Sequence, residues 1–140
     1  MVDLRRIKKI IDVDYLIDEI FKKQDSLDEK KIHRFEGELL LSATNAKTGK
    51  IKYFSNKTNV NFFEVMRASM AMPLVYGKLI SIGGKEFCDT PSSSFVELNI
   101  LKAIELGAKE ILVIDNSHLD YLTKFGFETW LLSQNKEFRK

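Results

Sequence analysis

The segment from residue 79 to residue 115 constrains the fold most, because short apolar runs alternate there with turn signals and a helical pattern. The apolar runs 79–82 and 85–88 flank Gly83-Gly84. Glycine adopts positive φ at little steric cost, so this dipeptide predicts a tight hairpin between two strands. A third strand is predicted over residues 111–115, after the helical pattern. Strands that alternate with helices indicate a layered α/β domain.

The helical pattern covers residues 97–106. Its apolar residues recur about every three positions, and Gly107 follows where a left-handed C-terminal cap is expected. Every residue from Ile111 to Ile114 is apolar, which is typical of a strand covered on both faces. Asp115 then either lies near the edge where α/β folds place ligands or caps the next turn.

Turn and cap signals also organise the N-terminal half. The segment Asn45–Gly49 separates two apolar runs, and its glycine permits the positive φ of a hairpin loop. Asn61, with Glu64 three residues later, resembles a capping box that begins a helix. Pro73 is expected to end that helix, because proline cannot donate to the preceding turn. The expected elements are a helix over residues 14–23 capped by Asp14, a polar connection over 24–34 with a short helical turn, strands over 38–43 and 50–54, and a helix from Asn61 through Met70.

Composition limits the class of protein. With 140 residues, of which 44% are hydrophobic, the chain can bury one ordinary core and is expected to form a single domain. The balance of 22 basic and 20 acidic residues provides no concentrated basic face, so no nucleic-acid partner is predicted. A single cysteine, Cys88, cannot form an internal disulfide, which favours a reducing compartment. No apolar run approaches the roughly 18–20 residues that span a bilayer, so a soluble, cytoplasmic protein is expected.

The basic N-terminal segment has two interpretations. Its apolar residues fall on one side, and basic residues flank them, so the segment could lie at an anionic lipid surface. Four acidic residues follow between Asp12 and Glu19, which favours a solvated first helix. Weak peripheral contact with a membrane stays open as the alternative. The apolar residues are Leu4, Ile7, Ile10 and Ile11, and the basic residues are Arg5, Arg6, Lys8 and Lys9.

Several motifs occur together in an order that resembles one known family. The motifs are Asp14-Tyr15-Leu16, Leu41-Ser42-Ala43-Thr44-Asn45 with Thr48-Gly49-Lys50 and Tyr53-Phe54, Arg67-Ala68-Ser69-Met70-Ala71-Met72-Pro73, the Gly83-Gly84-Lys85 hairpin before Asp89, and Ala103-Ile104-Glu105-Leu106-Gly107-Ala108. Over residues 13–115, the chain resembles the C-terminal half of bacterial patatin-like phospholipases. The resemblance implies a layered α/β sandwich, with residues 1–140 as a single partial patatin-like domain that lacks the nucleophile-bearing N-terminal portion.

The resemblance also implies a chemistry. Patatin-like enzymes are lipid acyl hydrolases with a Ser-Asp dyad, and Asp89 matches the catalytic acid of that dyad. The nucleophilic serine would stand on a strained turn, usually Gly-x-Ser-x-Gly, beside backbone N–H groups that stabilise the oxyanion. None of the seven glycines belongs to such a motif. The chain therefore resembles half of an active site, with no cofactor or metal expected.

The residues after Asp89 depart from the family pattern. Thr90-Pro91 replaces the glycines that usually follow the aspartate, and proline fixes φ and removes a donor. Asp89 either pairs with a serine supplied by another polypeptide or caps a turn at the end of its strand. The run Ser92-Ser93-Ser94 beside proline predicts a turn rather than a hidden nucleophile, and Cys88 predicts a packed thiol.

Three functions from different classes remain at this stage. The chain is the C-terminal part of a patatin-like lipid hydrolase, a non-catalytic patatin-like module for lipid or protein binding, or an unrelated α/β enzyme. The first implies a lipid or ester substrate and an N-terminal half that is either cut off from this sequence or separately encoded. A sheet that lacks neighbouring strands exposes edges and apolar faces, so a partner or a homo-oligomer is expected.

Overall fold

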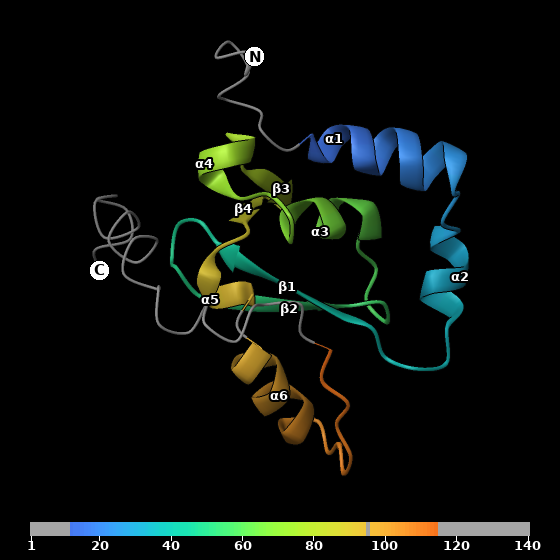
Figure 1. Ribbon diagram of the computed structural model, residues 1–140, viewed down its shortest axis with the longest axis vertical. Coiled ribbons are helices and arrows are strands. Elements are labelled where there is room, and N and C mark those ends of the chain that lie inside the picture. Colours follow the sequence, from blue (N-terminus) through green and yellow to red (C-terminus); the bar gives the residue numbers. More distant parts are fainter. Residues whose placement is uncertain (1–11, 95, 115–140) are drawn as a thin grey trace. The chain divides into compact units, whose positions relative to one another are not determined.

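The computed structural model describes residues 12–94 and 96–114 of the protein (Figure 1). The chain divides between Ser93 and Ser94 into two compact units, which we describe separately. The first unit contains a sheet and most of the helices, so the described chain has a mixed α/β fold. The expectation that residues 1–140 form one partial domain stays a prediction.

An antiparallel sheet of four strands, in the order β2-β1-β4-β3, forms the centre of the first unit. The strands are β1 (Leu40–Asn45), β2 (Ile51–Ser55), β3 (Ile80–Ile82) and β4 (Lys85–Cys88). All four lie within two residues of the predicted positions. Gly49, Gly83 and Gly84 have φ values of 68°, 58° and 74°, so the hairpin turns form where glycine was expected to allow them.

The two hairpins meet over a short length. β1 pairs with β2 along its whole course, from Leu40 opposite Ser55 to Thr44 opposite Ile51. In contrast, β1 pairs with β4 only at Thr44 opposite Cys88 and Asn45 opposite Phe87. The chain leaves the sheet directly after Cys88. We call this place, at the end of β4, the corner of the fold.

Five helical segments lie wholly or mostly in the first unit, and two differ from expectation. They are α1 (Val13–Tyr15) continuing as the π-helix η2 (Leu16–Gln24), α2 (Glu29–Arg34), α3 (Phe62–Ala68), α4 (Pro73–Tyr76) and α5 (Pro91–Ser94). Asp12, not Asp14, caps the first helix, because its carboxylate accepts the Tyr15 N–H at 3.0 Å. The prediction that Pro73 ends a helix was wrong. α3 already ends at Ala68, and Pro73 begins α4, where its missing N–H costs nothing.

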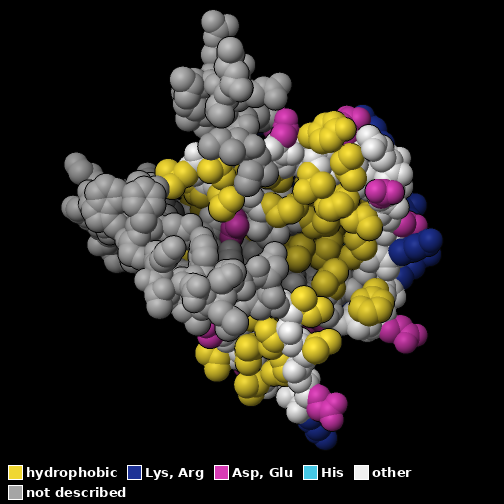
Figure 2. All heavy atoms as spheres, viewed as in Figure 1, with side chains coloured by type: hydrophobic (Ala, Val, Ile, Leu, Met, Phe, Trp, Pro, Cys, Tyr) yellow, Lys and Arg dark blue, Asp and Glu magenta, His cyan; other side chains and the backbone are white. Residues whose placement is uncertain are grey.

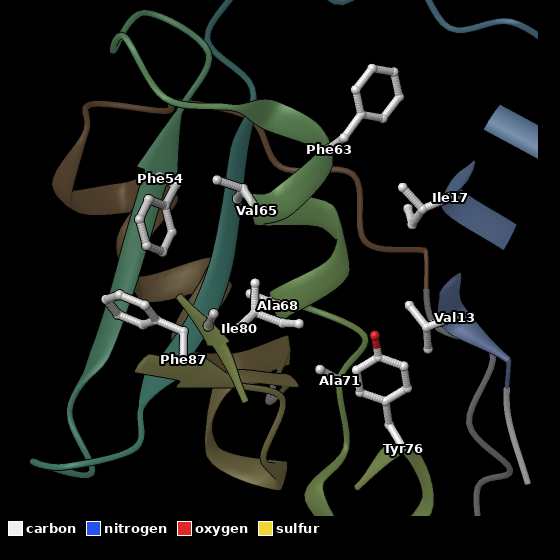
Figure 3. Packing of buried hydrophobic residues seen from close by; sticks show 11 residues of the cluster. Val13, Ile17, Phe54, Phe63, Val65, Ala68, Ala71, Tyr76, Ile80 and Phe87 are labelled. Carbon is white, nitrogen blue, oxygen red and sulfur yellow. The ribbon is translucent and has the colours of Figure 1, made fainter. Parts of the chain in front are cut away.

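Asn61 caps α3 as predicted, since its side chain accepts the Glu64 N–H at 3.1 Å. This cap directs the apolar face of α3 onto the sheet. Figure 3 shows Val65 and Ala68 facing Phe54, Ile80 and Phe87. The Phe54 and Phe87 rings meet edge to face with centroids 5.1 Å apart.

The helix over residues 13–24 forms a further layer. Val13 and Ile17 are buried and point toward Phe63 and Tyr76 (Figure 3). The first unit is therefore built as sheet, α3 with α4, and the helix over 13–24, in that order.

The described part of the second unit consists of α6 (Val96–Glu105) and the chain to Ile114. The predicted helix and its cap are confirmed, because Gly107 has φ 91° and its N–H donates to the Ile104 carbonyl at 2.9 Å. The predicted strand was wrong over residues 111–114, which form no strand. A strand needs a neighbour for its backbone groups, and no described residue pairs with this run. Asp115 lies outside the described residues.

Among residues 12–94 and 96–114, no helix has the length and apolar character needed to cross a bilayer. The basic N-terminal segment, for which peripheral membrane contact was considered, lies outside the described residues.

Candidate functional site at the end of β4

Asp89 directly follows β4 and is partly exposed, as expected for a carboxylate at a strand end. Its backbone N–H donates to the Ala71 carbonyl at 2.9 Å, which ties it to the connection between α3 and α4. Its neighbours Cys88 and Thr90 are buried. The backbone on both sides of Asp89 is therefore held, while the residue itself is partly exposed.

The chain after Asp89 forms a single helical turn. The Thr90 N–H donates to Ser93 Oγ at 3.0 Å, and the Ser93 N–H donates to the Thr90 carbonyl at 3.0 Å. The first bond is one half of a capping box, with serine in the position usually taken by Glu or Gln, and the second is a backbone bond of the turn. The expectation that the serine run forms a turn is confirmed for Ser93.

Ser93 also contacts the candidate acid. Its Oγ lies 3.2 Å from Asp89 Oδ1 and 2.9 Å from the Thr90 carbonyl oxygen. Only 3% of Ser93 is exposed, so an ester carbonyl cannot approach its hydroxyl in this conformation. The pair of Asp89 and Ser93 consequently organises the corner rather than forming a nucleophile and its base.

Two side-chain hydrogen bonds extend the contact between β1 and this corner beyond the last strand pair. Thr44 Oγ1 and Thr90 Oγ1 lie 2.7 Å apart, both buried. Ser42 Oγ donates to the Ser93 carbonyl at 2.6 Å. Because both bonds join the corner to a central strand, they fix the backbone from which the Asp89 carboxylate projects.

Cys88 is a packed thiol, as predicted. Burial raises the pKa of its thiol to about 11, and the nearby charge of Asp89 acts in the same direction. The thiolate is the nucleophilic form, so Cys88 is nearly unreactive at neutral pH. No group of three or more His, Cys, Asp or Glu side chains gathers within the described ranges in a way that could hold a metal ion.

A second polar cluster, which the sequence did not predict, surrounds Arg67 on α3. Arg67 is only 6% exposed, and its guanidinium meets carboxylates of Asp14, Asp18 and Glu64. From the sequence, Arg67 was expected only as part of a family motif at a helix end. One signal was available, since a cation within the apolar α3 sequence requires buried partners.

No protein-family model, no curated protein and no solved structure matches this chain. The resemblance to patatin-like phospholipases therefore depends on the sequence motifs alone.

Proposed function

We propose that this chain is the C-terminal part of a patatin-like lipid acyl hydrolase and contributes Asp89 as the acid of a Ser-Asp dyad. The serine and the oxyanion loop come from sequence outside these 140 residues, either upstream in a longer protein or on a separately encoded N-terminal half. The substrate is a lipid or another carboxylic ester, and the dyad needs no cofactor. We further propose a cytoplasmic protein with weak peripheral contact at the membrane that holds its substrate.

The position of Asp89 is the observation that carries this proposal. A dyad acid must present a carboxylate at the surface while its backbone stays fixed, because a small displacement from the nucleophile removes most of the rate. Asp89 meets both requirements, since it is partly exposed and its N–H is bonded to the Ala71 carbonyl at 2.9 Å.

The proposed reaction proceeds in two balanced steps. The serine hydroxyl gives its proton to the Asp89 carboxylate as its oxygen attacks the ester carbonyl carbon. The alcohol leaves with that proton, and an acyl-serine remains. Water then gives a proton to Asp89 and attacks the acyl-serine, which releases the fatty acid and restores the serine hydroxyl.

A non-catalytic patatin-like module is the alternative, and one observation favours it. The Ser93 hydroxyl lies 3.2 Å from Asp89 Oδ1, so a serine within the turn of α5 occupies one oxygen of the candidate acid. An aspartate that only caps a turn would leave the chain with a binding role toward lipid or protein.

The test isolates the tagged chain, with the proteins bound to it, from cells that naturally make it. Ester hydrolysis is measured, and a fluorophosphonate probe labels activated serines. We expect a labelled serine that lies outside these 140 residues and a loss of activity of at least roughly 100-fold in Asp89→Asn. Glu86→Gln, an exposed carboxylate on β4, is the matched control and should retain activity. Full activity in Asp89→Asn would favour the non-catalytic alternative.

A further inference from the structure

We propose that Arg67, Asp14 and Asp18 form an acid-releasable clasp that docks the helix over residues 13–24 onto α3 and α4. When the clasp opens, this helix leaves as a unit while the sheet stays folded. We call this helix the strap; it lies over α3 and α4 and contributes Val13 and Ile17 to the buried apolar cluster. The inference is independent of the proposed hydrolase function.

The geometry joins one buried cation to two carboxylates of the strap. Arg67 Nη1 lies 2.6 Å from Asp14 Oδ1, and Arg67 Nη2 lies 2.9 Å from Asp18 Oδ1. Asp14 also accepts a hydrogen bond from the Tyr76 hydroxyl, and its Oδ2 lies 2.9 Å from Lys78 Nζ. The strap is therefore bound through charges to α3, to α4 and to the residues after α4.

Apolar contact supports the docking but covers few residues. Val13 and Ile17 are almost fully buried, and Phe21 packs partly against the core. They face Phe63 and Tyr76 on the outer side of α3 and α4, whereas Phe54 and Phe87 belong to the sheet and lie on the other side of α3 (Figure 3). Release of the strap would uncover the outer layer and leave the contact between α3 and the sheet intact.

The charged contacts of Arg67 decide whether the strap stays docked. A buried guanidinium is costly unless several acceptors surround it, and loss of one partner leaves it incompletely paired. Glu64 lies 3.4 Å from Arg67 Nε and belongs to α3, so it stays with Arg67 when the strap leaves. The other two carboxylates depart with the strap. Their charge state therefore controls the docking equilibrium.

Several charged and titratable groups face the clasp. From the strap these are Asp14, Asp18 and Lys22, from α3 they are Glu64 and Arg67, and from α4 and the residues after it they are Tyr76 and Lys78.

The direction of the pH effect follows from Asp18. The hydrogen bond from Lys22 lowers the pKa of Asp18, burial opposes this, and Arg67 lowers it further. A carboxyl group with a lowered pKa stabilises the docked state above its unfolded pKa, near 3.9. That stabilisation is lost as the pH falls through the lower pKa of the docked state. Acid should therefore release the strap below about pH 4.

Hydrogen exchange with mass spectrometry on the full chain tests the clasp. After correction for intrinsic rates, amides of residues 16–24 should open about tenfold more often at pH 3.5 than at pH 7, while β1 and β2 stay protected. At pH 7, Asp18→Asn should raise opening of the same segment by roughly three- to tenfold. Glu19→Gln removes only an exposed pair with Lys23 and should change it less than twofold.

Two results would overturn the proposal. One is that the strap, β1 and β2 lose protection from hydrogen exchange together, both at pH 3.5 and at pH 7. The other is an equal effect of Asp18→Asn and Glu19→Gln.

Discussion

The two units differ in the exposure of large apolar side chains. In the first unit, the large side chains of Phe54, Phe62, Tyr76 and Phe87 are 2% exposed or less. In the described part of the second unit, Leu101, Ile104, Leu112 and Ile114 are 55–88% exposed. Figure 2 shows hydrophobic side chains at the surface over α6.

This difference shows what an apolar pattern specifies. An apolar sequence pattern indicates that one face of a helix or strand must pack against another segment. The helix or strand forms only if that packing partner is present. The first unit contains its neighbours, because two hairpins and α3 close on one another. The second has none among the described residues for Ile111–Ile114. Exposed apolar surface of this kind is typical of interaction sites.

The largest expected effect compares a buried with an exposed apolar side chain. Phe87 is 1% exposed and contacts Phe54, so Phe87→Ala should lower the free energy of unfolding by about 3–5 kcal/mol. Leu112 is 88% exposed, and Leu112→Ala should change the free energy of unfolding by less than about 0.5 kcal/mol. Urea unfolding followed by circular dichroism measures both. Equal losses would contradict the contrast between the units.

The rate of alkylation of Cys88 tests whether the corner beside Asp89 stays closed in the native state. Because burial raises the pKa of Cys88 to about 11, the thiolate should be scarce at pH 8 in the folded protein. We expect alkylation by iodoacetamide to be at least about 100-fold slower in the native state than in urea. Mass spectrometry over time gives both rates. Similar rates would mean that the corner opens readily.

The exposed apolar residues of the second unit are expected to cause self-association. Burying apolar surface contributes about 25 cal/mol per Å², so a few hundred Å² favour association by several kcal/mol before entropy is counted. We expect light scattering to detect a dimer or larger species. The paired change Leu112→Asp with Ile114→Asp should raise the concentration needed by about tenfold or more. A wild-type monomer at every concentration would contradict this expectation.

Local chemistry explains what the sequence predicted well. The hairpins require positive φ at Gly49, Gly83 and Gly84, and α3 requires a cap at Asn61, so short motifs were sufficient to locate them. The strand end at Asp89 followed from the same hairpin. The turn after Asp89 was also predicted, because a serine run beside proline favours a turn.

Long-range contacts explain what the sequence could not predict. Arg67 meets Asp14 across 53 positions of the chain and Asp18 across 49, and no local pattern records such a pairing. The run Ile111–Ile114 has the composition of a buried strand, yet composition does not supply a partner for its backbone. Pro73 was misinterpreted because proline is compatible both with the residues after a helix and with the first position of the next.

Ester hydrolysis by the purified chain alone tests the central claim most directly, namely that the chain carries the acid of a dyad but not its nucleophile. The substrate is a p-nitrophenyl ester, and the comparison is between wild type and Asp89→Ala. We expect equal rates, because Ser93 is 3% exposed and the Cys88 thiol is protonated at neutral pH. Clear turnover that a single substitution at Ser92, Ser93, Ser94 or Cys88 abolishes would contradict it.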